Sequence, residues 1–504
     1  MSTQGTSLPL SPAITPTWAG AAALEHWELL VIGDDLSGLQ AALEAADFQG
    51  RVGLIEQRIG QSKASTPVRS RTPCANAYAQ LLSAARSAAG SSQPVAWPFT
   101  KQLVESSASS TNANSVSPTS SRFELVPLAG WSVFTGPHTL AVHGREIAFH
   151  RAILATGSRD DRHAIKGLEE TGFITPETVD QLAEPPKRVA VLGSGARACE
   201  LAQALQLLGS DVSLVCEEAQ LLPREEPAAA AMVTRALESL GVRLQFGWRC
   251  LSTSNTGRAK SVLIAQGEEQ RKLIVDQIVL ALPRRANLER LGLEAAGIRS
   301  HERDGRLAIQ VDSRLATTNP RVFAVGEVCA GERGLEALRR MCSVAVQNAV
   351  GVARPRFDKS LVPRVVATHP QVAQIGLTSA EARARHMEVD TWLVPFHGEN
   401  SVPRQLDGVN LEDAITTEPA CREFALMNMV RDQPERVAGA TMVGSQAAES
   451  LALVSMLMAE ELPLSTLTTI PTLPVTAARA LAQLGEIIER NSRAQQGRVG
   501  RRVR

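Results

Sequence analysis

The hydrophobic positions of the chain repeat one pattern in two places. From Glu28, the apolar run ELLVI precedes a turn, an Ala-rich segment to about Asp47 and a second apolar run, RVGLIE, that ends at Glu56. From Arg188, the run RVAVL precedes the turn GSGARA, the segment CELAQALQLLG and the run DVSLVCE. Short apolar runs on both sides of a segment with helical periodicity predict a strand, a helix and a parallel strand. We therefore expect two βαβ units, the second belonging to a domain inserted into the first.

The remaining segments follow other patterns. The low-complexity stretch SSASSTNANSVSPTSS, Ser106 to Ser121, has almost nothing to bury and predicts a linker. After it, apolar and polar residues alternate in GWSVFTGPHTLAVHGREIAFHRAILATG, which predicts an antiparallel excursion that returns to the first sheet. From about Phe357, a strand pair around Val437 to Val443 and two Ala/Leu-rich helices predict a C-terminal α+β domain.

These patterns predict an α/β chain with two Rossmann-like nucleotide-binding domains and a C-terminal α+β domain. The expected boundaries are a disordered leader at 1–26, a first nucleotide-binding domain at 27–185 and 300–355 with a linker at 106–121, a second at 186–299, the α+β domain at 356–490 and a basic, solvated tail at 491–504. The leader contains no Lys or Arg and no apolar core of signal-peptide length.

Composition narrows the classes of function. The 504 residues carry 52 Lys and Arg against 52 Asp and Glu, so no general field would attract nucleic acid or an anionic membrane surface. The seven cysteines are scattered without a CxxC pair, which argues against a disulfide framework or a thiolate zinc site. His143, His369 and His397 lack ligand partners at short helical spacing, so we expect no metal site. We expect a cytoplasmic protein without nucleic-acid partners or membrane insertion.

The first turn has most of a dinucleotide-binding motif. Gly33 and Gly38 occupy the first and third glycine positions, and Glu56 lies 23 residues after Gly33, where an acid binds the adenosine ribose. The second glycine position holds Asp35. A carboxylate there would point toward a bound pyrophosphate, so the spacing supports a nucleotide site while Asp35 opposes it.

The second turn keeps the motif intact. Gly193, Gly195 and Ala198 give GxGxxA at the start of the expected helix. The ribose-binding position holds Cys216, followed by Glu217, so the expected acid is displaced by one residue. Because side chains alternate between the two faces of a strand, we expect Glu217 to lie on the opposite face from the ribose-binding position. The sequence therefore leaves the choice between NAD and NADP open.

Further motifs occur in a family order: ILATGSR at Ile153–Arg159, LLPREE at Leu221–Glu226, TTNPRVFAVGEV at Thr317–Val328, and GATMVGSQAAES. Their order and spacing resemble the class I pyridine nucleotide-disulfide oxidoreductases, the flavoprotein family of dihydrolipoamide dehydrogenase, glutathione reductase and mercuric reductase. The resemblance covers about Glu28 to Ile488. It implies FAD in the first domain, NAD(P)H in the second and a homodimer formed by the C-terminal domain.

The resemblance also implies roles for single residues. The ATG turn, Ala155, Thr156 and Gly157, would contribute to cofactor binding. Gly326 and Glu327 match a Gly-Asp pair whose acid binds the ribityl chain of the flavin, and Glu200 matches a residue near the flavin on the nicotinamide side.

The chain departs from this family at its redox centre. Cys74 aligns with the flavin-side cysteine, but Arg69 stands where the second cysteine should be. Leu473 and Ala478 replace the C-terminal His-Glu pair, and a leucine cannot transfer a proton. Cys74 is either a lone reactive thiol or a small buried hydrophobe.

Two hypotheses remain. The first is an FAD-dependent oxidoreductase that takes hydride from NAD(P)H and passes electrons to a small non-disulfide acceptor, with Glu200 and Cys74 as candidate catalytic residues. The alternative is a non-catalytic relative with degenerate nucleotide sites that acts as a dimeric binding or regulatory module.

Overall fold

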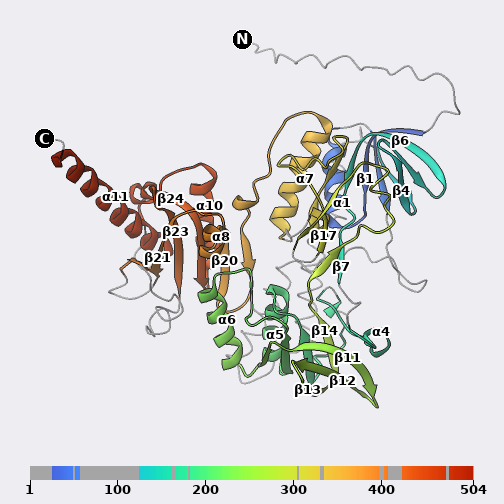
Figure 1. The fold of residues 1–504 in the computed structure, drawn as a ribbon, viewed down its shortest axis with the longest axis horizontal. Coiled ribbons are helices and arrows are strands. Elements are labelled where there is room, and N and C mark those ends of the chain that lie inside the picture. Colours follow the sequence, from blue (N-terminus) through green and yellow to red (C-terminus); the bar gives the residue numbers. More distant parts are fainter. Residues whose placement is uncertain are drawn as a thin grey trace, which may run out of the picture.

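The computed structural model has three parts, each built around a β-sheet (Figure 1). It describes residues 25–48, 51–56, 124–160, 165–176, 178–179, 182–303, 306–329, 334–396, 402–406, 423–472 and 476–502. The predicted leader before residue 25, the predicted linker at 106–121, Cys74, Arg69, His397 and Leu473 lie outside these residues. No helix in the described ranges is long and apolar enough to cross a bilayer.

The first part is a mostly parallel sheet with strand order β3-β2-β1-β6-β5-β4, and β18 pairs with β6. Its strands are β1 Glu25–Ile32, β2 Arg51–Glu56, β3 Glu124–Ala129, β4 Ser132–Gly136, β5 Thr139–Val142, β6 Arg145–Leu154 and β18 Val322–Ala324. Helices α1 Leu36–Ala46 and α7 Leu335–Val350 pack together on one face. Leu29 and Val31 contact that layer, whereas Leu30 and Ile32 contact the core of the opposite face. Burial on both faces explains the continuous apolar run.

Two details of this sheet concern the sequence predictions. The antiparallel excursion is confirmed, since β4 pairs with β5 and β5 with β6, which then runs parallel to β1. The predicted start of the first strand was wrong, because β1 begins at Glu25 rather than Glu28. Glu25 and His26, placed in the disordered leader, pair with Ile147 and Ala148 of β6. The long β6 supplies backbone hydrogen-bond partners for Glu25 and His26, and the polarity of these two residues gives no sign of that pairing.

The second part is a parallel sheet of order β10-β9-β8-β14, made of β8 Arg188–Leu192, β9 Asp211–Cys216, β10 Arg243–Phe246 and β14 Gln277–Leu280. Its helices are α5 Ala196–Leu207 and α6 Pro227–Ser239. An antiparallel sheet follows, with β11 Arg249–Thr256, β12 Ala259–Gln266 and β13 Glu269–Val275. The predicted second βαβ unit is therefore confirmed, with α5 as its helix.

Several short elements lie within these two parts or connect them. They are β7 Ser158–Asp160, α4 Leu168–Thr171, β15 Arg284–Ala286, β16 Ser300–Arg303, β17 Arg306–Ile309 and the 3₁₀ helix η3 Gly326–Cys329. Strand β7 leaves the first part and β15 returns from the second, and the two pair in antiparallel fashion. This ribbon is the double connection expected for an inserted domain.

The third part is an antiparallel six-stranded sheet of order β19-β20-β24-β23-β21-β22. The strands are β19 Arg364–Val366, β20 Gln371–Gly376, β21 Val389–Pro395, β22 Arg404–Gln405, β23 Phe424–Val430 and β24 Gln433–Gly444. The helices are η4 Lys359–Leu361, α8 Ser379–Ala384, α10 Ala447–Ala459, η5 Leu464–Thr469 and α11 Ala477–Arg502. The prediction of a solvated tail from 491 missed that α11 continues to Arg502. Pairs such as Arg493 with Glu489, one turn apart, support this extension.

The second and third parts share one hydrophobic core. Residues of α5 and α6 pack with Val366, Phe424 and Val443 of the antiparallel sheet. At the same boundary, the buried Glu226 carboxylate accepts hydrogen bonds from the Ser379 backbone N–H at 2.6 Å and the Asn428 side chain at 3.2 Å. Buried polar groups satisfied in this way fix the contact between the two parts.

Candidate cofactor-binding site

The turn after β1 requires glycine at two positions. Gly33 has φ +123°, and a Cβ there would lie 2.0 Å from the carbonyl oxygen of Ala155. A Cβ on Gly38 would lie 2.0 Å from the carbonyl oxygen of Gly33. Any larger residue would separate α1 from the ends of β1 and β6, so these two glycines set the close packing of a dinucleotide turn.

Three segments meet at this turn. Gly157, which follows β6, is so close to Asp35 that a Cβ on Gly157 would lie 2.6 Å from Asp35 Oδ2. Gly326, which follows β18, would with a Cβ meet Ser37 Oγ at 2.7 Å. Since β1, β6 and β18 are parallel, these segments lie at the carboxyl edge of the sheet, where ligands bind in open α/β folds. The structure thus brings together most of the residues that the sequence placed around FAD.

Asp35 is the N-cap of α1. Its Oδ1 accepts a hydrogen bond from the Gly38 backbone N–H at 2.9 Å and another from Ser37 Oγ at 2.7 Å. Burial and, to a smaller extent, the nearby charges of Glu327 and Asp34 raise the pKa of Asp35 to about 6, against the hydrogen bonds from Gly38 and Ser37 that lower it. The carboxyl group is therefore mostly ionised at neutral pH. This carboxylate accepts the hydrogen bond of a backbone N–H at the N-terminus of α1, which a nucleotide phosphate would otherwise accept.

Glu327, in η3, also has partners within the chain. Ser158 Oγ donates a hydrogen bond to its carboxylate, and Arg284 Nη1 lies 3.5 Å from Glu327 Oε2. Arg284 Nη2 also donates to the carbonyl oxygen of Ser158 at 2.5 Å. The β7–β15 ribbon therefore supplies a hydroxyl and a cation to the acid that the resemblance assigns to the ribityl chain. Sequence reasoning missed both residues, because Arg284 lies 126 positions from Ser158.

Two other predicted residues are placed by backbone contacts. Thr156 Oγ1 donates to the carbonyl oxygen of Asn287 at 2.8 Å, and the Asn287 side chain donates back to the Thr156 carbonyl oxygen. Glu56 is the last residue of β2 and pairs with Ala129 of β3. Its backbone therefore lies at the carboxyl end of the strand next to β1, as the ribose-binding position requires.

The second turn has the same backbone and an open helix terminus. Gly193 has φ +137°, and a Cβ there would lie 2.4 Å from the carbonyl oxygen of Ala281, while Ala198 packs directly beneath it. Gly195 is the N-cap of α5, and a Cβ there would meet nothing within 4 Å. This is the open cradle that a pyrophosphate needs, so the residues of the second turn fit a dinucleotide.

The first turn fits a dinucleotide less completely. Its glycines and the three converging segments match the cradle, but the Asp35 carboxylate competes for the Gly38 N–H. FAD must therefore displace or neutralise this carboxylate to use the N-terminus of α1.

At the end of β9, Cys216, Glu217 and Glu218 have different surroundings. Cys216 is buried, and its Sγ lies 3.5 Å from the carbonyl oxygen of Gly193. Glu217 is exposed. Glu218, which sequence reasoning passed over, accepts a hydrogen bond from Ser194 Oγ in the glycine turn at 2.7 Å. Alternation along the chain could have identified it, since residues two apart share a face.

Glu200 is buried at the boundary with the third part. Its Oε1 accepts a hydrogen bond from the backbone N–H of Ala367 at 2.8 Å. Burial raises the pKa of Glu200 to about 7, against that hydrogen bond and the charge of Arg197. One turn later, Gln203 exchanges two hydrogen bonds with the backbone of His369. Glu200 thus anchors the segment after β19, and its predicted place beside the flavin stays a prediction.

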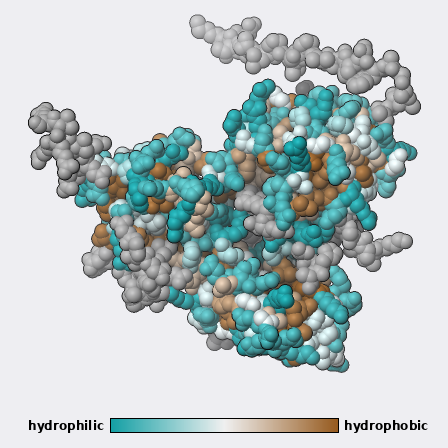
Figure 2. All heavy atoms as spheres, in the orientation of Figure 1, coloured by the Kyte–Doolittle hydropathy of each residue, from teal (hydrophilic) through white to brown (hydrophobic). Residues whose placement is uncertain are grey.

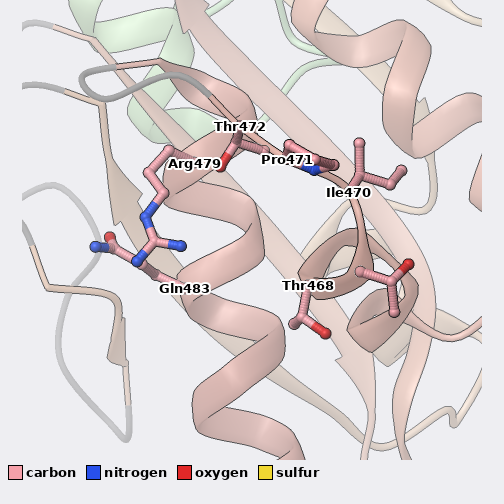
Figure 3. Close-up of a pocket in the computed structure, with 7 residues that line it drawn as sticks. Thr468, Ile470, Pro471, Thr472, Arg479 and Gln483 are labelled. Carbon is pink, nitrogen blue, oxygen red and sulfur yellow. The ribbon is translucent and has the colours of Figure 1, made fainter.

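The third part contains a polar pocket of about 520 Å³ between η5 and the start of α11 (Figure 3). Its lining residues are Thr468, Thr469, Ile470, Pro471, Thr472, Arg479 and Gln483. Arg479 is paired with Glu486 at 3.2 Å. The pocket lies beside Ala478, at the position of the family's glutamate, and none of its seven lining side chains is a carboxylate, imidazole or thiol.

The five cysteines that the structure describes are all protonated free thiols at neutral pH. Burial raises the pKa values of Cys250 and Cys216 to about 12, so these thiols stay protonated at neutral pH. Cys199, Cys329 and Cys342 are also free thiols with raised pKa values. Among the residues that the structure describes, no group of three or more His, Cys, Asp or Glu side chains could hold a metal ion.

Comparison with known proteins identifies the family. A family model described as pyridine nucleotide-disulphide oxidoreductase matches residues 27–350, and the model of that family's dimerisation domain matches residues 362–479. The chain therefore belongs to the pyridine nucleotide-disulphide oxidoreductases, a family of flavoprotein oxidoreductases. The predicted resemblance and fold class are confirmed, and the family implies FAD and NAD(P)H.

Individual relatives support this assignment. The chain is 31% identical to a mercuric reductase of Bacillus cereus over 284 residues, 56% of this chain and 44% of that protein. It is 32% identical to a dihydrolipoyl dehydrogenase of Thermus scotoductus over 336 residues, 66% of this chain and 68% of that protein. The matches span 44% and 50% of the mercuric reductases of Bacillus cereus and Staphylococcus aureus, about half their length.

A solved structure has the same fold. The HOCl-induced flavoprotein disulfide reductase RclA from Escherichia coli superposes with a TM-score of 0.72 and 22% identity, over 91% of this chain and 99% of that one.

Proposed function

We propose that this protein is an FAD-dependent NAD(P)H oxidoreductase that passes electrons to a small non-disulfide acceptor. The observation that carries the proposal is the convergence of Gly33, Gly157 and Gly326 at one edge of the first sheet, beside Glu327. Gly33, Gly38 and the Ala155–Gly157 turn would hold FAD, with Glu56 at the ribose and Glu327 at the ribityl chain. When bound, FAD supplies the hydride and electron transfer that protein side chains cannot.

The second turn is the proposed site of the nicotinamide coenzyme. Gly193, Gly195 and Ala198 form its cradle, and the N-terminus of α5, whose N-cap Gly195 makes no side-chain cap hydrogen bond, would face the phosphates. Glu217 and its neighbour Glu218 are the acids near the ribose. This assignment is supported by the space that a glycine leaves at position 195.

The acceptor class follows from the sequence around Cys74. With Arg69 at the position of the second cysteine, a disulfide cannot form between these two positions, and Leu473 removes the proton carrier of the thiol reductases. A quinone, a dye-like small molecule or oxygen needs neither group. Cys74 and Glu200 remain the proposed catalytic candidates, and a Cys74→Ser variant tests the thiol directly.

The family's dimerisation domain implies a homodimer. In this domain the large side chains of Met456, Leu462 and Ile470 are 47%, 38% and 43% exposed. Hydrophilic residues cover most of the face drawn in Figure 2, with hydrophobic residues in separate groups between them. Light scattering of the purified chain would give the mass of two subunits.

The proposal is tested by the visible spectrum of purified protein after free flavin is removed. A bound flavin that bleaches anaerobically with NADH or NADPH, and is reoxidised by a quinone or oxygen but not by glutathione disulfide or lipoamide, supports it. A folded dimer that stays colourless and cannot be reconstituted with FAD would contradict the proposed oxidoreductase function.

The second candidate is a non-catalytic dimeric module with degenerate nucleotide sites. Two observations favour it: Asp35 already caps α1, and Glu327 is already paired with Ser158 and Arg284. The colourless, non-reconstitutable dimer is the result that this candidate expects.

A further inference from the structure

A single carboxylate is tethered to the glycine turn of the second nucleotide-binding part. Ser194 lies between Gly193 and Gly195, is 5% exposed, and donates its hydroxyl hydrogen bond to Glu218 Oε2 at 2.7 Å. The backbone of Glu218 is fixed as well, because its carbonyl oxygen accepts from the Gly247 N–H at 3.2 Å. One hydrogen bond to the side chain and one to the backbone carbonyl therefore hold Glu218 beside the turn. The second carboxylate oxygen, Oε1, remains available as a hydrogen-bond acceptor.

The charges around this carboxylate bear on whether it would bind a ribose with a free 2′-hydroxyl or one with a 2′-phosphate. Cys216, the last residue of β9, is buried against Gly193 and presents no acid. Ala219 and Gln220 follow Glu218, so the next basic residue in the chain is Arg224. Arg197 lies near Glu200, whose pKa it lowers. The strand end thus presents negative charge beside the turn, where the adenosine ribose of a dinucleotide lies.

We propose that Glu218 is the residue that selects NADH against NADPH. The inference rests on the proposed function, in which the second turn binds the nicotinamide coenzyme. Oε1 of Glu218 accepts a hydrogen bond from the ribose 2′-hydroxyl of NADH. The 2′-phosphate of NADPH would bring its negative charge against the same carboxylate. Ser194 is a positioning residue that orients Glu218.

Binding to the full-length protein, measured by titration calorimetry with NAD⁺ and with NADP⁺, tests this without any turnover. We expect wild-type protein to prefer NAD⁺ by about tenfold or more. Glu218→Gln keeps an acceptor for Ser194 but removes the charge, and should reduce the preference by about tenfold, mainly through tighter binding of NADP⁺. Ser194→Ala should reduce the preference by a smaller factor.

The matched comparison is Glu217→Gln, which removes the same formal charge from the other acid near the proposed ribose site. It should change the preference by a smaller factor than Glu218→Gln does, because the Ser194 hydroxyl orients Glu218. An equal or larger effect of Glu217→Gln would overturn the role of Glu218. Wild-type protein that binds NADP⁺ as tightly as NAD⁺ would overturn the inference and leave the proposed function standing. Protein that binds neither nucleotide would overturn the proposed function itself.

Discussion

Asp35 and Gly195 occupy the same position in the two glycine turns of the chain. Asp35 has φ −73° and ψ −178°, Gly195 has φ −78° and ψ 178°, and each is the N-cap of the helix that follows. Two residues earlier, Gly33 and Gly193 have φ +123° and +137°. The extended backbone at the N-cap suits any residue, so glycine is needed there for space rather than for conformation. At this N-cap position the first turn has a side chain that the second lacks, and the Asp35 carboxylate takes up a backbone donor, the Gly38 N–H.

Replacing Asp35 should strengthen FAD binding. A carboxylate a few Å from a pyrophosphate costs about 1 kcal/mol in water and about 4 kcal/mol at an effective dielectric near 20, which predicts a roughly five- to thousandfold gain for Asp35→Gly at neutral pH. Loss of the cap costs only a few tenths of a kcal/mol when glycine replaces it. Titration of flavin-free protein with FAD, followed by flavin fluorescence, gives the dissociation constant.

Two further variants separate charge from occupancy. Asp35→Asn keeps a cap for the Gly38 N–H but removes the charge, and Asp34→Asn removes the charge of the exposed neighbour. A gain with Asp35→Asn identifies the charge as the obstacle, and a gain confined to Asp35→Gly identifies the occupied N–H. If FAD affinity is the same in all four proteins, Asp35 does not oppose the cofactor.

FAD affinity should depend on pH. The pKa of Asp35 is about 6 without FAD, and a phosphate nearby would raise it further, so binding takes up a proton. Affinity therefore rises as pH falls from about 8 toward 6 and levels off below the pKa of the free protein. Dissociation constants across this range measure the effect. Asp35→Asn should have no such slope, and a wild-type affinity that stays constant would contradict the assignment.

The sequence predicted the two βαβ units because their signals are local: apolar runs, glycines and spacing. Asp35 was identified as a conflict for the same reason. Glu200 was different, since its hydrogen-bond partner Ala367 lies 167 residues away and no local pattern links the two. Glu218 lies between these cases, because the alternation of side chains along a strand could have identified it but could not show that Ser194 would donate a hydrogen bond to it. The extension of α11 beyond residue 490 was missed because this segment is polar and basic and its support comes from ion pairs between turns.

Gly195 and Gly193 should respond differently to alanine. A Cβ on Gly195 meets no atom within 4 Å and its φ of −78° suits alanine, so Gly195→Ala should leave the melting temperature unchanged and weaken nicotinamide coenzyme binding by about tenfold or more. Gly193→Ala should destabilise the domain, because its φ is +137° and its Cβ would lie 2.4 Å from the Ala281 carbonyl oxygen. Thermal melting and NAD⁺ titration measure the two effects. Unchanged coenzyme affinity in Gly195→Ala would mean that the coenzyme does not approach this turn.

Burial of Glu200 should lower the free energy of unfolding as the pH rises from about 4.5 to about 7. Its folded pKa of about 7 lies above the ordinary 4.5, so the unfolded chain ionises first as pH rises. The free energy of unfolding therefore falls between these two pKa values, by a total on the order of 3 kcal/mol, and levels off above about pH 7.

Glu200→Gln retains an acceptor for the Ala367 N–H and cannot ionise. Its melting temperature should match the wild type near pH 4.5 and exceed it by several degrees at pH 8. Glu238→Gln, on the exposed face of α6, is the control and should show no pH-dependent difference. A Glu200→Gln difference that is constant with pH would show that the pKa of Glu200 is the same in the folded and unfolded chains.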